Sequence, residues 1–489
     1  MFRWQNSQIP IARGARIQEY TDALRKGVLN KSGIVRTVRE NIEQASPLNA
    51  FLRTFSEQEA LQLTGSHSHE NEEKRVLDGV PFSLKDCFDV PGYPTTAATK
   101  SLADHVVDAD KEYTAFIKRL LTAGAVPVGK NNMHELGCGT SGINTHAGAV
   151  KNPHNISFIA GGSSSGTGAI VGSGVLPFGV GADTQGSGRI SAVFCGSHGF
   201  CPTPGRYGSS SKMSVATNGT PTLLCRSISD ISLIDSVMAG EKEYARTDPT
   251  PPAHCKVGVP NRHFWGNLED EVKLITTRLL GKMRNRGIGI QPIEFPEEII
   301  TLNKSISTDI TMYEFFQSLQ EYIRNHQLDD KLTIKDIVAS VETPAVKELL
   351  TQYLNNPVSE ERYNKIINEE RPRLLKLFHD TLEEHGVDTI IMPTAPVPPS
   401  RLQEGETVTV NGEEVPLFST HIRNCELSST LGCPSLAMCA GKTKTNGVPV
   451  GLSVDGKPGQ DRELLGIGCI LEKIIPTLPL PEISAGTAE

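Results

Sequence analysis

The sequence predicts one large α/β domain, in which a twisted mixed β-sheet is covered by helices on both faces. Its length of 489 residues and its apolar content of 38% provide enough material for a large core. Short apolar segments typical of buried strands alternate along the chain with segments typical of helices. The glycine- and serine-rich segment 161–189 has small side chains throughout, which indicates that a helix packs closely on a strand there.

The elements follow from the pattern of apolar residues. The expected strands are short apolar segments, namely Asn49–Thr54, Val80–Leu84, Val126–Lys130, Pro177–Ala182, Lys256–Pro260 and Asp388–Met392. The expected helices are longer segments with apolar residues at helical spacing or with small side chains, namely two within Ile17–Ala45, then Asp110–Ala123, Thr167–Val175, Ser227–Ala239, Glu269–Arg286, Thr311–His326, Ile334–Val341, Val346–Tyr353, Glu360–His385 and Leu464–Ile474.

Composition excludes several classes of protein. The net charge of -8 argues against a general nucleic-acid-binding surface, which needs a basic face. No apolar run reaches 18 residues, so we expect no membrane span. The 10 cysteines lack CxxC and zinc-finger spacing, so we expect free thiols, no metal and a cytoplasmic protein. The N-terminal segment contains Arg3, Arg13 and Arg16 before its first acidic residue, Glu19. An organellar transit peptide is therefore the alternative to a cytoplasmic location.

The segment 161–189 is the main candidate for a functional site. Its dense glycines allow positive φ angles and a close approach of the backbone to a ligand. A tight loop is expected after the strand at 177–182, and its amides are placed to converge as an oxyanion hole. The residues of this loop are Thr184, Gln185, Gly186 and Ser187. Ser187 is a candidate nucleophile, although the loop alone also fits a plain turn serine.

A serine nucleophile needs a base, and the residues leave three interpretations. Gly161-x4-Gly166-Thr167 resembles a phosphate loop, but the lysine of that motif is missing, which argues against nucleotide binding. The run 162–166 matches the GxSxG nucleophile elbow, with Ser164 as the nucleophile. In the third interpretation Ser187 is the nucleophile, Lys85 is the base, and a serine of 163–165 bridges them.

Lys85 ends the apolar segment 80–84, and a buried lysine there is costly unless it is paired or acts as a neutral amine. Taken alone, this segment favours a surface lysine that pairs with Asp86. Spacing alone does not choose between the nucleophile elbow and the lysine-based interpretation.

Several motifs in order carry a resemblance to a known family. They are GVPFSLKD (79–86), GGSSSGTGA (161–169), GADTQGSGR (181–189) and FCGSHGFCPTPGRYG (194–208). Together they resemble the amidase signature family of Ser–cis-Ser–Lys hydrolases, and the similarity covers nearly the whole chain. The segments MYEFF (312–316), HIRNCELSS (421–429) and GQDRELLGIGCILEK (459–473) most resemble the branch of the indoleacetamide and mandelamide hydrolases.

This resemblance implies roles for individual residues. It identifies Ser187 as the acylating serine, Ser163 as the bridging serine with a cis peptide bond, and Lys85 as the base. It places oxyanion donors at residues 184–187 and assigns supporting roles to Ser164, Asp183 and Arg189. Burial disfavours the ammonium form, so Lys85 is expected to be neutral and to receive a proton through Ser163 as Ser187 attacks the carbonyl carbon. No metal or organic cofactor is implied.

The resemblance also divides the chain. Residues 1–75 are expected to form a helical segment packed on the core, and residues 76–475 the catalytic domain, followed by a tail at 476–489. A mostly helical insert at about 299–385 is expected to roof the substrate pocket. The expected pocket residues are Leu136, Gly137, Cys138, Tyr313 and Phe316, with Phe315 as a further aromatic candidate; helix-core packing is the alternative for the three aromatic residues. The family's usual nucleophile loop differs from this chain at Ala182, Gln185 and Gly188, which predicts an unusual pocket.

The expected activity is hydrolysis of a small-molecule carboxamide to an acid and ammonia or an amine, with an aryl or arylacetamide substrate favoured. Carbamate, ester or anilide hydrolysis by the same three residues stays open. Two other classes also remain, namely an amidotransferase subunit that supplies ammonia for a tRNA-linked substrate and a non-catalytic scaffold. The acidic charge argues against the first, and the joint presence of Lys85, Ser163 and Ser187 argues against the second. A homodimer stays open.

Overall fold

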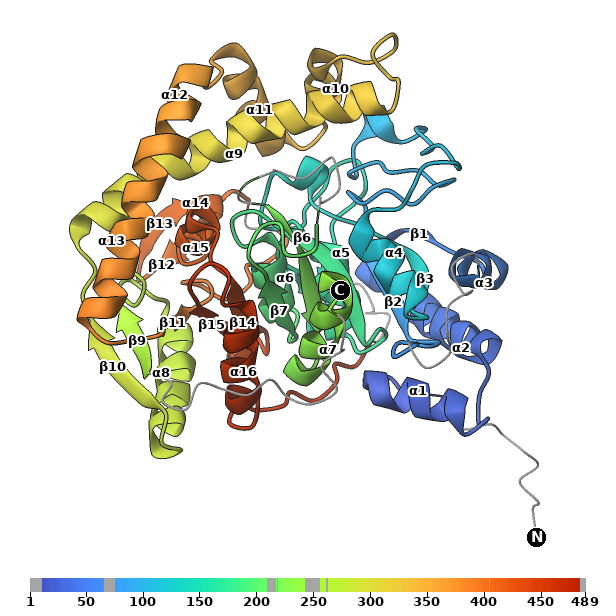
Figure 1. Ribbon diagram of the computed structural model, residues 1–489, viewed down its shortest axis with the longest axis horizontal. Helices are drawn as coiled ribbons and strands as arrows, with labels where there is room; N and C mark the ends of the chain where they lie inside the picture. The colour runs from blue at the N-terminus through green and yellow to red at the C-terminus, as the bar shows by residue number, and fades with distance from the viewer. Residues whose placement is uncertain are drawn as a thin grey trace.

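The computed structural model describes residues 11–65, 75–208, 217, 219–241, 256–260, 263–403 and 405–483. Within them, one sheet of 11 strands crosses the whole molecule (Figure 1). In spatial order its strands are β1 (Phe51–Thr54), β3 (Val126–Asn131), β2 (Pro81–Lys85), β6 (Phe178–Asp183), β8 (Thr220–Cys225), β7 (His198–Cys201), β14 (Ser435–Lys442), β15 (Pro449–Asp455), β11 (Thr389–Pro393), β9 (Lys256–Pro260) and β10 (Gly289–Ile293). All six predicted strands are present in it.

The sheet is mixed, as the sequence predicts. Strand β2 runs parallel to both β3 and β6, whereas β6, β8, β7, β14, β15 and β11 follow one another in antiparallel pairs. Because β2 and β6 are parallel neighbours, their carboxyl ends lie at the same edge of the sheet. Two small hairpins lie outside this sheet, β4 (Lys151–Asn152) with β5 (Asn155–Ile159), and β12 (Thr407–Val410) with β13 (Glu413–Pro416).

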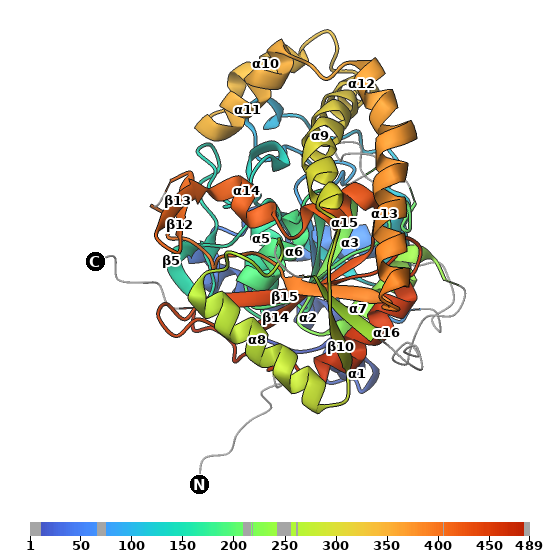
Figure 2. The same cartoon turned by 90° about the vertical axis from the view of Figure 1, so that its left-hand side faces the viewer.

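Helices cover both faces of the sheet (Figures 1 and 2). Their bounds are α1 (Ile17–Arg25), α2 (Lys31–Gln44), α3 (Glu57–Gly65), α4 (Ala115–Thr122), α5 (Ser165–Gly172), α6 (Ser187–Phe194), α7 (Ile228–Ala239), α8 (Asp270–Asn285), α9 (Glu297–Asn325), α10 (Ile334–Ser340), α11 (Pro344–Asn355), α12 (Glu360–Lys365), α13 (Arg371–Glu384), α14 (Leu417–Ile422), α15 (Glu426–Leu431) and α16 (Asp461–Glu472). A π-helical turn, Ile366–Glu370, joins α12 to α13.

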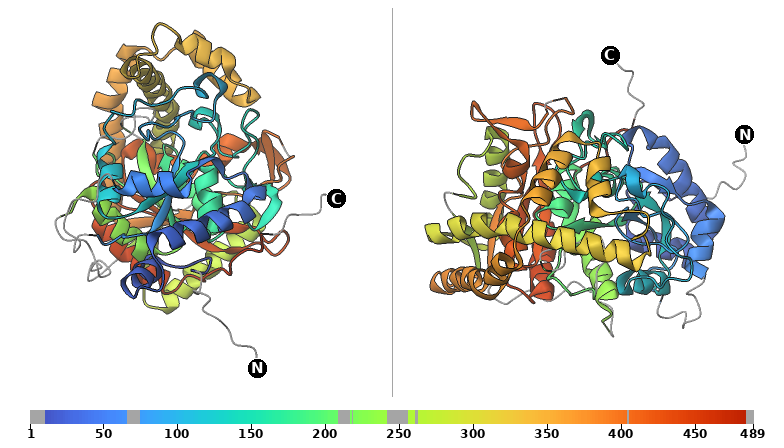
Figure 3. Two further views of the ribbon diagram at one scale, coloured as in Figure 1. Left: turned by 90° about the vertical axis from the view of Figure 1, so that its right-hand side faces the viewer. Right: turned by 90° about the horizontal axis from the view of Figure 1, so that it is seen from above.

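Strand β14 shows how the two faces are built. Successive side chains of a strand point to opposite faces. Leu436 accordingly joins the core cluster that contains Leu464 of α16, and its neighbour Ala437 joins the cluster that contains Ile190 and Val193 of α6. The α/β class with a twisted mixed sheet and helices on both faces is therefore confirmed. The N-terminal helices α1 to α3 lie at the end of the sheet formed by β1 (Figure 3, blue).

The helical insert lies above the sheet, with α9 crossing the molecule (Figures 1 and 3, yellow). The sequence predicts a helix from Thr311, but α9 is a single helix of 29 residues that begins at Glu297. The earlier start follows from tertiary packing, because Ile299, Ile306 and Ile310 are buried against α13 and β11 in a core of their own. Helix α4 differs from the prediction in the opposite direction, because it begins at Ala115, five residues later than the predicted Asp110.

No helix among the described residues is both long and apolar enough to cross a membrane. Residues 1–10 and 484–489, which belong to the predicted N-terminal segment and C-terminal tail, lie outside the described part of the chain.

Candidate active site

Lys85 is the last residue of β2, and its side chain is only 2% exposed. Burial lowers the pKa of its ammonium group, which favours a neutral amine. The interpretation of Lys85 as a surface lysine paired with Asp86 is wrong, because Asp86 forms a buried ion pair with Lys130 over 2.8 Å. Lys130 therefore neutralises that carboxylate and leaves Lys85 to make another contact.

Lys85 makes this other contact with Ser163. Lys85 Nζ donates a hydrogen bond to Ser163 Oγ over 2.6 Å, and Ser163 Oγ donates to Ser187 Oγ over 3.0 Å. The Gly162–Ser163 peptide bond is cis, as the resemblance implies. The structure thus places the side chains of Lys85, Ser163 and Ser187 in one continuous hydrogen-bonded chain.

Ser187 is the first residue of α6, and the tight loop predicted at 183–187 precedes it. Gly186 has a φ of +112°, which a residue with a side chain rarely adopts, and this turn starts the helix. The Gly186 amide donates to Asp183 Oδ1 over 2.7 Å, so it holds the loop rather than a ligand. Among the described residues, the amides of Thr184, Gln185 and Ser187 have no hydrogen-bond partner, so these three remain candidate oxyanion donors.

Ser164 occupies a different environment from its neighbour. Its Oγ donates to the carbonyl of Ala182 over 2.9 Å and accepts from the amide of Ala182 over 3.1 Å, and the side chain is fully buried. A hydroxyl that is saturated by the backbone of β6 has no free geometry for attack on a substrate. The geometry therefore favours Ser187 over the nucleophile-elbow interpretation, and it gives Ser164 a supporting position.

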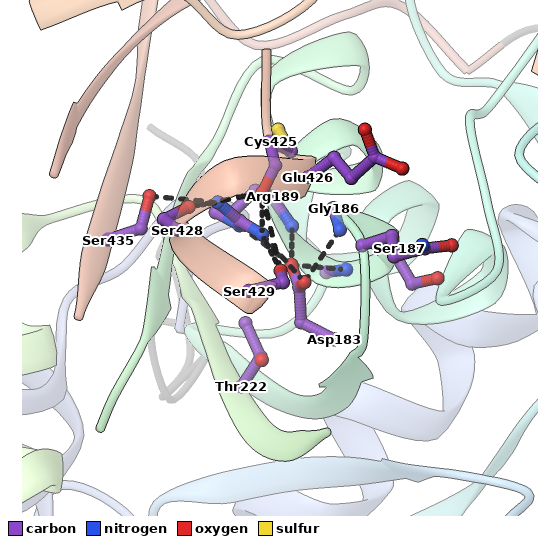
Figure 4. A network of polar contacts seen from close by, with 12 residues as sticks. Asp183, Gly186, Ser187, Arg189, Thr222, Cys425, Glu426, Ser428, Ser429 and Ser435 are labelled. Carbon is purple, nitrogen blue, oxygen red and sulfur yellow. Dashed lines mark hydrogen bonds and ion pairs between the residues drawn. The ribbon is translucent and has the colours of Figure 1, made fainter. Parts of the chain in front are cut away.

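A buried ion pair between Asp183 and Arg189 lies beside the loop that carries Ser187 (Figure 4). Both side chains are 0% exposed, and Arg189 Nη2 lies 3.0 Å from Asp183 Oδ1. Asp183 also accepts from the amides of Gly188 and Arg189, each over 3.0 Å. Burial raises the pKa of Asp183, but the charge and hydrogen bonds of Arg189, together with the Gly186 amide, hold that pKa below its usual range. The carboxylate therefore organises the backbone on both sides of Ser187.

Arg189 uses its remaining donors on a distant segment. It donates to Ser428 Oγ over 2.7 Å, to Ser429 Oγ over 2.7 Å and to Ser435 Oγ over 3.1 Å. These serines lie on α15 and β14, which follow Ser187 by more than two hundred residues. The arginine thus joins the nucleophile loop to the C-terminal part of the sheet.

We expect Arg189→Ala to lower the free energy of unfolding by about 3–5 kcal/mol, because it leaves the Asp183 charge buried without a partner. Denaturant titration followed by circular dichroism measures this. Lys376→Ala is the matched control, because it removes an exposed pair with Asp380 on α13 and should cost at most about 0.5 kcal/mol. If the two variants lower the free energy of unfolding by similar amounts, the buried pair between Asp183 and Arg189 does not stabilise the fold as expected.

Gly188 follows Ser187 at a crowded position, where the resembling family usually has a larger residue. A Cβ atom at Gly188 would lie 2.5 Å from Thr222 Cγ2 and 2.8 Å from Thr222 Cβ. Thr222 is part of the buried strand β8 and cannot move aside easily. Thr222 therefore occupies the volume of the missing side chain, which explains this departure from the family pattern.

Gly188→Ala is expected to destabilise the protein by about 1–3 kcal/mol through overpacking, as measured by the denaturation midpoint. Gly281→Ala provides the control, since Gly281 also lies in a helix but a Cβ there has no atom within 4 Å. That control should be neutral or stabilising by up to about 1 kcal/mol, because alanine favours helix. An unchanged denaturation midpoint in Gly188→Ala would contradict the close contact with Thr222.

A cavity of about 100 Å³ opens beside Lys85, Ser163 and Ser187. Leu136, Gly137 and Cys138 line it, as expected. Tyr313 and Phe316 are absent from the lining, and Tyr313 instead stacks on Tyr363 with ring centroids 4.0 Å apart. Phe315, their neighbour on α9, lines the cavity instead. It lies three residues after Met312 and four before Leu319, and residues at these intervals face the same side of a helix.

The sequence also indicates pocket residues within 131–142 and 419–429, where Met133 and Ile422 line the cavity, but it missed Met312, Leu319, Leu349 and Phe418. The lining residues of α9 are spaced as on one helix face, at Thr308, Thr311, Met312, Phe315 and Leu319. That spacing is present in the sequence, but it does not show which face of α9 is turned to the cavity. Among the described residues, no group of three or more His, Cys, Asp or Glu side chains is arranged to hold a metal ion.

Comparison with known proteins shows the family of this chain. Residues 33–465 match the profile of the amidase family. Indoleacetamide hydrolase of Agrobacterium vitis is 32% identical over 456 residues, which cover 92% of this chain and 95% of that protein. Mandelamide hydrolase of Pseudomonas putida is 32% identical over 468 residues, with coverages of 92% and 89%. A crystal structure of an amidase aligns with a TM-score of 0.78 at 27% identity, over 94% of this chain and 100% of that one.

The chain belongs to the amidase family, and it is a hydrolase that acts on amide C–N bonds. The resemblance found in the sequence motifs is thereby confirmed.

Proposed function

We propose that this protein hydrolyses the carboxamide of an aryl or arylacetic acid through an acyl-enzyme on Ser187. The observation that carries the proposal is the hydrogen-bonded chain from Lys85 through Ser163 to Ser187 at the edge of an apolar cavity. The chain provides a nucleophile and a route for its proton, and the cavity provides a place for the acyl group.

For the first step, the two hydroxyl groups turn so that Ser187 donates to Ser163 and Ser163 donates to the neutral amine of Lys85. Ser187 Oγ then attacks the amide carbon as its proton passes to Ser163 Oγ, while the proton of Ser163 passes to Lys85. The carbonyl oxygen becomes an oxyanion, which the amides of Thr184, Gln185 and Ser187 stabilise. Collapse of this intermediate breaks the C–N bond, and the proton returns along the same route to the leaving nitrogen. Water then attacks the ester of Ser187 with the same proton route, which releases the acid and restores the serine.

The cavity supports an aromatic acyl group. Its lining from α9 and α14 is mainly apolar, with Met312, Phe315, Leu319, Phe418 and Ile422. Burial of an aromatic ring against such side chains is favourable, and no described lysine or arginine except Lys85 reaches the lining to select an anionic group. The two relatives compared above are named for indoleacetamide and for mandelamide, and both of these amides carry an aromatic acyl group.

Ser187→Ala is expected to lower kcat/KM on indole-3-acetamide or mandelamide by a factor on the order of 10⁶. Release of ammonia measures this, and a fluorophosphonate probe should label the wild type but not the variant. The same panel, extended to matched esters, carbamates and anilides, identifies the preferred leaving group. Ser164→Ala is the matched control, because Ser164 is adjacent to Ser163 but bonded to backbone. Activity that persists in Ser187→Ala and is lost in Ser164→Ala would overturn the proposal.

The pH profile tests the role of Lys85. A base must be neutral, so kcat/KM should rise with pH as Lys85 loses its proton and then reach a plateau; burial moves this limb below the usual pKa of lysine. Lys85→Met should lower kcat/KM by roughly 10²–10⁴-fold and abolish the rising limb. Lys118→Met on the exposed surface of α4 should keep the wild-type profile. A rising limb that survives in Lys85→Met would assign it to another group.

A further inference from the structure

Gln185 is the departure from the usual nucleophile loop that the proposed mechanism does not explain, because only its backbone amide takes part there. Its side chain lines the cavity and is 7% exposed. The Nε2 group donates a hydrogen bond to Ser307 Oγ on α9 over 2.8 Å. The side chain therefore connects the oxyanion loop directly to the helix that lies above the cavity.

The contact with Ser307 determines which way this amide is turned. Glu426 lies nearby: burial raises the pKa of its carboxyl group, Ser307 and Asn303 oppose that rise, and Asn303 Nδ2 donates to it over 3.0 Å. In the hydrogen bond between the two side chains, Gln185 Nε2 donates and Ser307 Oγ accepts. The amide nitrogen of Gln185 must then face Ser307. This hydrogen bond turns Nε2 towards α9 and leaves Oε1 as the other polar atom of the amide.

As a consequence, Gln185 Oε1 is a hydrogen-bond acceptor in a fixed position that receives no hydrogen bond from the described residues. This oxygen belongs to a side chain of the cavity lining, at the side where α9 contributes Thr308, Met312 and Phe315. Because Ser307 lies one residue before Thr308 on the same helix, the anchored amide is on the part of the cavity that we assign to the acyl group.

We propose that Gln185 Oε1 accepts a hydrogen bond from an N–H or O–H group on the acyl part of the substrate, so that Gln185 selects aryl amides that carry such a donor. This inference rests on the proposed function. A hydrocarbon acyl group would strip water from the oxygen and return no hydrogen bond, which is costly in an apolar cavity. An acyl group with a donor restores the bond, and discrimination against analogues that lack it follows.

The test uses two pairs of amides that differ mainly in one donor. Indole-3-acetamide is compared with naphthalene-1-acetamide, and mandelamide is compared with phenylacetamide. For at least one pair, the wild type should show a kcat/KM roughly tenfold higher for the member with the donor. A ratio close to one for both pairs in the wild type would overturn the inference even if a variant fails to fold.

The variant Gln185→Met keeps the length of the side chain and removes its acceptor. The preference should fall close to one, because the donor-bearing amide should lose more of its kcat/KM than the donor-free amide does. Thr308→Val is the matched control, because it removes another polar group from the same side of the cavity, and it should keep the wild-type ratio.

Each outcome has one meaning. Equal rates within both pairs for the wild type, or an equal loss for both members in Gln185→Met, would overturn the selective role and leave Gln185 as a structural link only. If the ratio falls in Thr308→Val instead, the acceptor of this hydrogen bond is Thr308, and the role of Gln185 is overturned. If the wild type hydrolyses none of the four aryl amides, the proposed function itself is wrong and this inference falls with it.

Discussion

The buried ion pair between Asp183 and Arg189 is the interaction on which the rest of the site depends. Asp183 ends β6, and its carboxylate receives the backbone amides of Gly186 and Gly188 on either side of Ser187. A carboxylate without exposure to water is tolerated only when its lone pairs are filled by donors, and here a guanidinium and several amides fill them. The loop conformation that presents Ser187 therefore follows from the need to satisfy one charge.

The same arginine connects this loop to the C-terminal part of the sheet through Ser428 and Ser429 on α15. Helix α15 begins at Glu426, which accepts from Asn303 on α9, and Ser307 of the same helix accepts from Gln185. The polar contacts thus form a closed ring that runs from the loop to α15, to α9 and back to the loop. Such a ring holds the helix above the cavity at a defined position relative to Ser187, although these segments are far apart in the sequence.

Sheet topology brings the third part of the site to this ring. Strands β2 and β6 are parallel neighbours, so Lys85 at the end of β2 and Asp183 at the end of β6 reach the same edge. Ser163 lies in the loop before α5 and fills the space between Lys85 and Ser187. The apolar cavity then lies over this edge, which is where open α/β sheets commonly bind ligands.

The sequence by itself determined the fold class, the six predicted strands and the glycine-rich loop, because these depend on local periodicity and on backbone freedom near each residue. Its motifs also pointed to Lys85, Ser163 and Ser187 together. Only the tertiary structure decided that Asp86 pairs with Lys130 and not with Lys85, that Phe315 faces the cavity in place of Tyr313 and Phe316, and that Gly186 donates to Asp183. These facts depend on which partner is near in space, on the rotation of a helix about its axis and on competition for a buried acceptor, and no local pattern encodes them.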